Sequence, residues 1–151
     1  ILTLLVTPVR KITGWAQLGR LRRMLGLFTF FYASLHLLAY SFLLLELDFP
    51  ALGEELIERP YITVGFLAWL MLVPLAWTSS QHMVRRLGGI WLNVHRLVYG
   101  IALLAVLHVF WLVKSSYLEA SIYGVLLLSL LIYRLFAREN RLFRQGVKVL
   151  A

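Results

Sequence analysis

The chain has 151 residues, of which 61% are hydrophobic and 15% are charged. Soluble domains usually have about 45–50% apolar and about 25% charged residues, so an ordinary water-soluble domain is excluded. Lysine and arginine number 15 and aspartate and glutamate 7, which gives a net charge of +8. Such an apolar chain fits poorly with disorder or nucleic-acid binding. Cysteine is absent, so disulfides and thiol chemistry are excluded and redox chemistry would need a bound cofactor.

Four long apolar segments follow one another, at residues 24–45, 61–77, 91–113 and 117–136. A hydrocarbon core of about 30 Å needs about 20 helical residues per crossing, so each segment predicts a membrane span. Residues 1–6 form an apolar run followed by Arg10 and Lys11, which predicts the end of a span whose beginning is missing. We therefore expect an all-α integral membrane helical bundle, with four full spans plus the end of a truncated N-terminal span. Residues 1–151 would form a single domain.

The charges are distributed unequally between the two sides of this predicted bundle. One side collects 13 of the 15 basic residues, and the other collects six of the seven acidic residues. Short cytoplasmic loops carry an excess of Lys and Arg, so the basic side is predicted to be cytoplasmic. Arg134 would begin a basic stretch, and residues 137–151 would form a basic cytoplasmic tail. Four residues of this tail are spaced to share one helix face with affinity for anionic lipid: Arg138, Arg141, Arg144 and Lys148.

Three of the four histidines lie inside apolar spans: His36 in the first, and His95 and His108 in the third. Ionisable groups at this depth are costly and indicate function. Without intramembrane acids, a proton relay or a cation transporter lacks its usual partners, and a zinc site would need three or four convergent ligands. Neutral imidazoles between apolar walls instead suit the axial positions of haem iron. The alternative is that each histidine is hydrogen-bonded to a neighbouring helix. His82 lies in a polar stretch, residues 78–82, and is expected to be a solvated loop residue.

The depths of the histidines suggest which two form a pair. At 1.5 Å per residue, His36 lies about 22 Å and His108 about 25 Å from the basic side, whereas His95 lies about 6 Å from it. We therefore expect His36 and His108 to be the two ligands of one haem toward the outer leaflet. His95 has no histidine opposite it, so a second haem there would need a different ligand. On an ideal helix His95 and His108 are about 220° apart, so they share a face only if the helix is irregular, for which Gly100 offers one place.

Several ordered sequence blocks resemble the MsrQ (YedZ) family, the haem-binding membrane subunits of the bacterial MsrPQ methionine sulfoxide reductase system. This family belongs to the wider ferric reductase-like transmembrane group, which typically has six spans. The resemblance covers nearly the whole chain. The blocks are RRMLGL (22–27), FYASLH (31–36), RPYITVG (59–65), PLAWTS (74–79), RRLG (85–88), HRLVY (95–99) and WLVK (111–114).

The resemblance implies a b-type cytochrome of the bacterial inner membrane. Such a subunit passes electrons from the quinone pool or a reduced flavin, supplied by a flavin reductase, to a periplasmic molybdopterin methionine sulfoxide reductase (MsrP), which repairs oxidised proteins. It transfers electrons, is not the catalytic subunit of the system, and is associated with FMN as well as haem b. The alternatives are a ferric or quinone reductase-type cytochrome with another acceptor, or, from another class, a colourless transporter or structural membrane subunit.

The resemblance also implies roles for individual residues. His36, His95 and His108 match the family's haem histidines and so would be the iron ligands. In the wider group a fourth histidine stands 14 positions before the residue that matches His36, where this chain has Arg22. We hypothesise that Arg22 or Arg23 faces a propionate of an inner haem or substitutes near its iron. The alternative is that both arginines anchor the first span at the cytoplasmic interface. The acidic outer loop, residues 46–58, would be a docking surface for the partner or merely a solvated loop.

Overall fold

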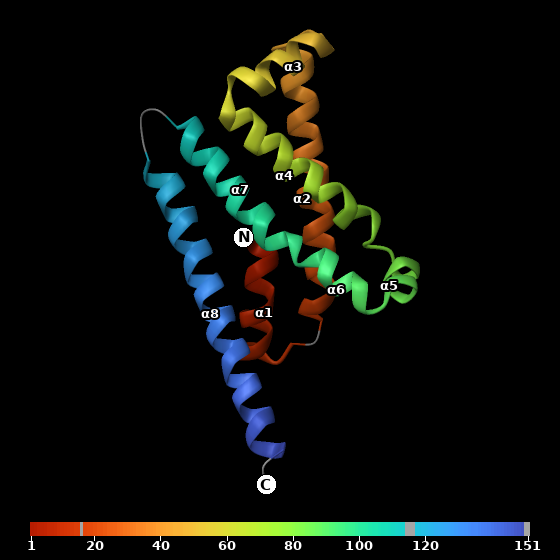
Figure 1. Ribbon diagram of the computed structural model, residues 1–151, viewed down its shortest axis with the longest axis vertical. Helices are drawn as coiled ribbons and strands as arrows, with labels where there is room; N and C mark the ends of the chain where they lie inside the picture. Colours follow the sequence, from red (N-terminus) through yellow and green to blue (C-terminus); the bar gives the residue numbers. More distant parts are fainter. Residues whose placement is uncertain (16, 114–116, 150–151) are drawn as a thin grey trace.

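The computed structural model describes residues 1–15, 17–113 and 117–149, with the side chains of 49 and 138–149 left out. This part of the chain contains no strand, so the predicted all-α class is confirmed. Figure 1 shows how its helices are arranged. The eight helices are α1 (Leu2–Thr13), α2 (Leu18–Leu43), α3 (Phe49–Glu58), α4 (Pro60–Trp77), α5 (Gln81–Leu87), α6 (Gly89–His95), α7 (Leu97–Leu112) and α8 (Leu118–Val149).

The four predicted membrane spans are all present. Segments long and apolar enough to cross a membrane run over Leu18–Leu43, Pro60–Trp77, Gly89–Leu112 and Leu118–Ala137. In each of them at most 17% of the most apolar window is buried inside the protein, so most of these apolar residues keep contact with the surroundings, as residues that face lipid do. The chain is therefore a multi-pass membrane protein. The four spans run alternately up and down the bundle (Figure 1), as the alternation of charged loops predicts.

Two short helices, α3 and α5, lie in the connections, where only loops were expected. Each follows a side chain that caps its first turn. The carboxylate of Asp48 accepts a hydrogen bond from the backbone N–H of Ala51 at 3.2 Å, and the hydroxyl of Ser80 accepts one from the N–H of Met83 at 3.2 Å. The expectation that His82 lies in a loop is therefore wrong, because His82 is in α5, although its side chain is exposed as expected.

The third span is broken into α6 and α7 at Arg96. The backbone N–H of Arg96 lies 3.2 Å from the carbonyl oxygen of Leu92 and 3.1 Å from that of Asn93, which is the tightened pattern of a 3₁₀ turn. The third span is thus irregular next to His95, while the helix is continuous at Gly100, the place that the sequence offered for such an irregularity. Gly100 instead permits close packing, because a Cβ atom there would lie 3.3 Å from the Met71 methyl group of α4.

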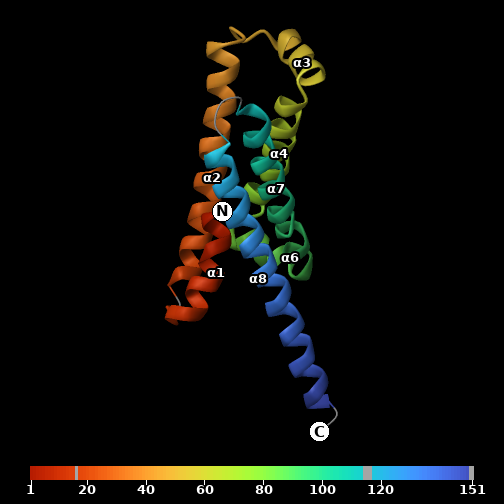
Figure 2. The same ribbon diagram turned by 90° about the vertical axis from the view of Figure 1, so that its left-hand side faces the viewer.

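Helix α4 is the central element of the packing. It contacts α2, α3, α6 and α7, while α1 packs on α2 and α8 packs on α7. Figure 2 shows α2 on one side of the bundle and α4 with α7 on the other. At mid-depth, Leu72 and Leu75 of α4 and Ile101 of α7 form a buried apolar cluster, against which Phe30 and Ala33 of α2 pack. This cluster joins the helices that carry His36 and His108.

Arg134 lies inside the fourth span, Leu118–Ala137, within the bounds that the sequence predicts for it. Its guanidinium donates to the Tyr99 hydroxyl at 2.6 Å, to the Leu4 carbonyl oxygen at 3.1 Å and to the Thr7 hydroxyl at 3.0 Å. It also lies 5.4 Å from the centre of the Tyr99 ring. Arg134 therefore fastens α8 to both α7 and α1. Helix α8 continues to Val149, but the predicted basic face of the tail lies outside the described side chains.

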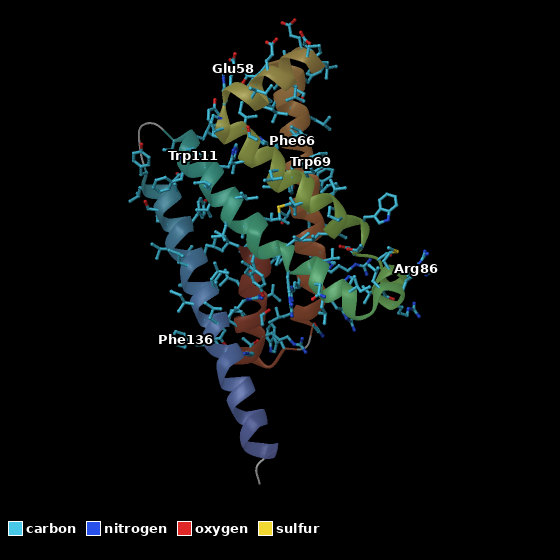
Figure 3. All side chains as sticks on the ribbon, in the orientation of Figure 1. Glu58, Phe66, Trp69, Arg86, Trp111 and Phe136 are labelled. Carbon is cyan, nitrogen blue, oxygen red and sulfur yellow. The ribbon has the colours of Figure 1, made fainter. Side chains whose placement is uncertain are left out.

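Arg134→Met should destabilise the bundle, because it leaves three oxygen atoms without their charged donor. Hydrogen bonds to charged groups contribute about 1.5–3 kcal/mol each, and partial compensation should bring the total loss to about 2–4 kcal/mol. The measurement is the thermal unfolding midpoint of the purified protein in detergent. Arg86→Met is the matched control, because Arg86 lies at the outer edge of α5 (Figure 3). Equal midpoints for the two variants would contradict this role of Arg134.

Candidate functional site

His108 of α7 is held against α4 by a hydrogen bond and by close packing. Its Nδ1 lies 2.7 Å from the carbonyl oxygen of Tyr61. A carbonyl oxygen can only accept, so Nδ1 donates this hydrogen bond, and in a neutral imidazole that arrangement places the lone pair on Nε2. The ring lies directly over Gly65, where a Cβ atom would be 2.7 Å from Nδ1 and 2.8 Å from Cε1. A histidine held through Nδ1 in this way can bind a metal only through Nε2.

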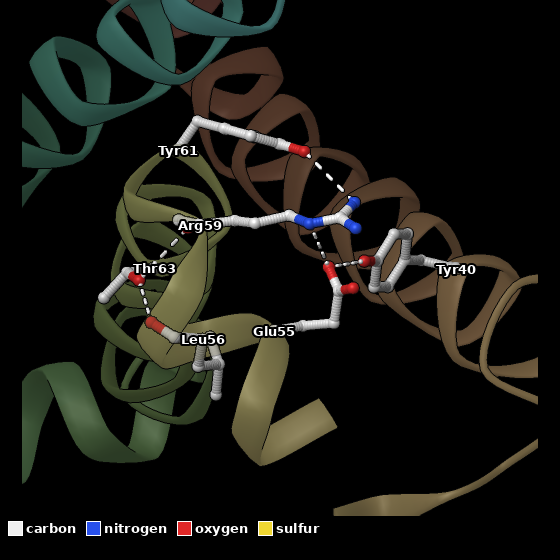
Figure 4. Close-up of polar contacts among 6 residues, drawn as sticks. All are labelled: Tyr40, Glu55, Leu56, Arg59, Tyr61 and Thr63. Atoms are coloured by element: carbon white, nitrogen blue, oxygen red, sulfur yellow. Dashed lines mark hydrogen bonds and ion pairs between the residues drawn. The ribbon is translucent and has the colours of Figure 1, made fainter. Parts of the chain in front are cut away.

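The carbonyl that holds His108 lies in the first turn of α4, and a polar network fixes this turn to α2 and α3 (Figure 4). Glu55 accepts a hydrogen bond from the Tyr40 hydroxyl at 2.9 Å and forms an ion pair with Arg59, whose Nε is 3.1 Å away. Arg59 also donates to the Tyr61 hydroxyl at 3.5 Å. This hydrogen bond, together with the Glu55 carboxylate, raises the pKa of Arg59, so Arg59 stays charged. The Thr63 hydroxyl adds a hydrogen bond to the Leu56 carbonyl oxygen.

His36 lies in the outer half of α2 and its side chain is exposed. Two residues earlier, Ser34 accepts a hydrogen bond from Trp69 Nε1 of α4 at 3.0 Å. Two helical residues subtend about 200°, so His36 is on the side of α2 that faces away from Ser34. Arg22 and Thr29 precede His36 by 14 and 7 residues, close to whole helical turns, so they share its helix face. Both line cavities beside α1. An uncovered imidazole in an apolar span is consistent with a face that a cofactor covers.

The heights of His36 and His108 can be compared through the apolar cluster at mid-depth. His36 stands three residues beyond Ala33, and His108 stands seven residues beyond Ile101, in helices that run in the same direction. At 1.5 Å per residue both lie on the outer side of this cluster, at heights that differ by about 6 Å. No described hydrogen bond joins the two rings, and the described residues contain no cluster of three or more His, Asp or Glu that could hold a metal ion. Their pairing on one iron stays a prediction.

His95 lies at the other end of the bundle, in the last residue of α6. Its ring stacks on Trp91 with 3.9 Å between the ring centres and an angle of 25°, and its Nδ1 lies 3.1 Å from the Trp91 carbonyl oxygen. His95 and Arg22 both line one cavity of about 660 Å³. Arg23 also lines this cavity, so the two arginines singled out in the sequence do lie beside His95, and their role stays a hypothesis.

The residues at the outer end fit a haem, judged by the chemistry of their donor atoms. The Nδ1–H of His108 is anchored on a backbone carbonyl oxygen, which is the usual arrangement of a histidine ligand. On the His36 side of α2, Leu25 and Tyr32 line a cavity beside α1, and a haem requires apolar and aromatic walls of this kind. Tyr61 and Gly65, which orient the ring, were not identified as site residues from the sequence. The available signal was a glycine in an apolar span, which often indicates close approach of another group.

Comparison with known proteins assigns the chain to a family. The model of the ferric reductase like transmembrane component matches residues 1–106, and the chain belongs to this family of membrane helical bundles. No solved structure matches it.

Among curated relatives, the chain is 54% identical over 138 residues to a protein of Xanthomonas campestris pv. campestris (strain B100), covering 91% of this chain and 63% of the relative. It is 48% identical over 139 residues to a protein of Azospira oryzae, covering 91% of this chain and 60% of the relative. Both are named protein-methionine-sulfoxide reductase heme-binding subunit MsrQ. The predicted resemblance is therefore confirmed, and the chain spans about three fifths of the length of these relatives.

Gly65→Ala should destabilise the protein, although alanine in a helix is normally more stable than glycine by about 0.5–1 kcal/mol. The new methyl group would overlap the His108 ring, and overpacking of this kind costs about 1–3 kcal/mol. The thermal unfolding midpoint shows whether Gly65→Ala lowers or raises the stability of the protein. The control is Gly26→Ala in α2, where a Cβ atom meets nothing within 4 Å, so its midpoint should stay or rise. A rise in both variants would show that the His108 ring is not held over Gly65.

Proposed function

We propose that this protein is the b-type haem electron-transfer subunit of a methionine sulfoxide reductase system in the bacterial inner membrane. The observation that carries the proposal is His108, an intramembrane histidine whose Nδ1 is anchored on the Tyr61 carbonyl oxygen. The names of the relatives support it, because they are haem-binding subunits. On this proposal residues 1–151 form one ferric reductase-like membrane domain, and the subunit transfers electrons without performing covalent catalysis.

His36 and His108 would hold the iron of one haem from two helices that both pack on α4. Haem, when bound, supplies one-electron redox chemistry at its iron. His108 would orient its Nε2 toward the iron because the Tyr61 carbonyl keeps the proton on Nδ1. The apolar side chains of α2 and α7 would exclude water and limit the polarity around the site. Axial ligands, burial and nearby charge set the potential of such a centre.

The orientation of the chain follows from its charges. The basic ends of the helices would face the cytoplasm and the α3 end would face the periplasm. Electrons would enter from the quinone pool or from a reduced flavin, for which the resemblance implies FMN. They would leave at the periplasmic side to a molybdopterin subunit (MsrP) that reduces methionine sulfoxide in oxidised proteins.

The difference spectrum of the purified protein, dithionite-reduced minus oxidised, tests the haem assignment. With haem quantified per chain, His36→Ala and His108→Ala should each lose most of the b-type spectrum, because each would remove one of the two residues proposed to hold the iron. The exposed His82 provides the control, and His82→Ala should retain the full spectrum. A colourless protein despite haem supply, or full haem content in both ligand variants, would contradict the proposal.

Charge reversal on α3 tests the partner surface. The exposed side chains of Glu54 and Glu58 belong to the acidic outer loop, and reversing charges at the rim of an interface mainly slows association. Glu54→Lys with Glu58→Lys should therefore slow electron delivery to the periplasmic partner several-fold while the haem spectrum stays unchanged. Glu119→Lys, on the same side but in α8, is the matched control. Electron delivery at the same rate in wild type, the double variant and Glu119→Lys would exclude α3 as the docking site.

A further inference from the structure

One carboxylate at the outer end links the helix of His36 to the helical turn that holds His108. The Oε2 atom of Glu55 accepts a hydrogen bond from the Tyr40 hydroxyl of α2 at 2.9 Å and lies 3.1 Å from Nε of Arg59, at the start of α4 (Figure 4). Both donors therefore meet at the same oxygen atom. Tyr40, Glu55 and Arg59 together form a clamp between α2, α3 and α4.

On the α2 side, the clamp begins on the helix face that carries His36. Tyr40 follows His36 by four residues, so the two side chains lie about 40° apart around the helix and about 6 Å apart along its axis. The hydroxyl of Tyr40 is bound to Glu55 of α3. The clamp therefore ties α2 to α3 one helical turn beyond a residue proposed to hold the iron.

On the α4 side, Arg59 is bound to the first turn of the helix through both its backbone and its side chain. Its carbonyl oxygen accepts hydrogen bonds from the N–H of Ile62 at 2.9 Å and of Thr63 at 3.3 Å. Its guanidinium donates to the Tyr61 hydroxyl at 3.5 Å. The carbonyl oxygen of Tyr61, in the same turn, accepts the hydrogen bond from Nδ1 of His108. Arg59 therefore connects the carboxylate to the acceptor of His108.

The hydrogen bond of His108 depends on where this turn lies. A Cβ atom on Gly65 would be 2.7 Å from Nδ1 of His108, so the ring lies directly against the backbone of α4. Hydrogen bonds weaken as the distance grows and the angle departs from linearity. A shift of the first turn of α4 would therefore weaken the bond between Tyr61 and His108.

Burial distinguishes Glu55 from the other acids of α3. Only 18% of its side chain is exposed, against 50% of the side chain of Arg59, whereas the side chains of Glu54 and Glu58 are exposed. Charges attract more strongly where water is partly excluded, because the effective dielectric constant is lower. The carboxylate also makes its hydrogen bond with Tyr40 a charge-assisted one. Glu55 thus acts within the protein, while its neighbours face the surroundings.

We propose that Glu55 is a positioning residue for His108, because the clamp holds the first turn of α4 where the Tyr61 carbonyl binds Nδ1. A hydrogen bond from Nδ1 makes a histidine ligand more basic. A more basic ligand favours ferric over ferrous iron, because ferric iron carries the higher charge. Glu55 thereby lowers the midpoint potential of a haem held by His108. This redox effect rests on the proposed function, whereas the hold on the His108 ring does not.

Exchange of the Nδ1 proton of His108 with deuterated water tests the hold on the ring. The full chain, labelled with ¹⁵N-histidine and reduced with dithionite, is followed by NMR, and His108→Ala identifies the signal among four histidines. Glu55→Gln keeps the size of the side chain but removes its charge. Exchange should become about tenfold faster, as expected for loss of one hydrogen bond. Glu119→Gln, an exposed acid of α8, is the control and should leave the rate unchanged. Equal rates in wild type and Glu55→Gln would overturn the proposal.

The midpoint potential separates positioning from the general electric field of the two charges. By field alone, removing the anion in Glu55→Gln raises the potential and removing the cation in Arg59→Gln lowers it. By position, both variants weaken the hydrogen bond from Nδ1, so both raise the potential. In Glu55→Gln the ratio of reduced to oxidised haem should rise about tenfold at a fixed applied potential, or about 59 mV for one electron. Arg59→Gln should shift it in the same direction by less, and a potential below that of wild type would overturn the proposal.

The two measurements also separate this proposal from the proposed function. A wild-type protein without a b-type spectrum would contradict the proposed function, and proton exchange at His108 would still decide the role of Glu55. A b-type spectrum that depends on His36 and His108, with equal exchange rates in wild type and Glu55→Gln, would overturn the role of Glu55 alone. Faster exchange together with the raised potential supports both.

Discussion

The contact between α4 and α7 is the constraint on which the arrangement of the bundle depends. The two helices approach closely because Gly65 and Gly100 carry no side chains where the other helix needs room. Gly65 accommodates the His108 ring, and Gly100 accommodates Met71. This approach brings the Tyr61 carbonyl to 2.7 Å from Nδ1 of His108. A packing feature of two helices therefore also decides which nitrogen of an intramembrane histidine is available to bind a metal.

The two ends of the bundle present different chemistry. The α3 end has imidazoles at its margin and an acidic helix above them, and its polar side chains are paired through Glu55 and Arg59 (Figure 4). The opposite end has an open cavity with arginines from three helices. An apolar middle, built on Leu72, Leu75 and Ile101, separates them. The two ends of the bundle therefore differ in charge and in the side chains that they offer to a ligand or partner.

Arg134 illustrates how a charge is tolerated inside a span. Three oxygen atoms from two other helices surround its guanidinium, directly beyond an apolar cluster of Leu4, Leu127 and Leu130. Because lipid offers no hydrogen-bond partners, a buried guanidinium must find its acceptors within the protein. Arg134 thereby makes the packing of α8 depend on α1, a helix with which it has no sequence proximity.

The sequence by itself determined the four spans and the family, because hydrophobic length and ordered residue blocks are local properties of a chain. Pairing of the intramembrane histidines also began as a sequence argument, and it remains a prediction. Only the tertiary structure decided that His108 is anchored by Tyr61 over Gly65, that Arg134 is interior, and that Arg10, Arg22, Arg23 and Arg85 surround one cavity. These features join residues from different helices, and the rotation of each helix about its axis is set by packing between helices, which no spacing within a single segment records.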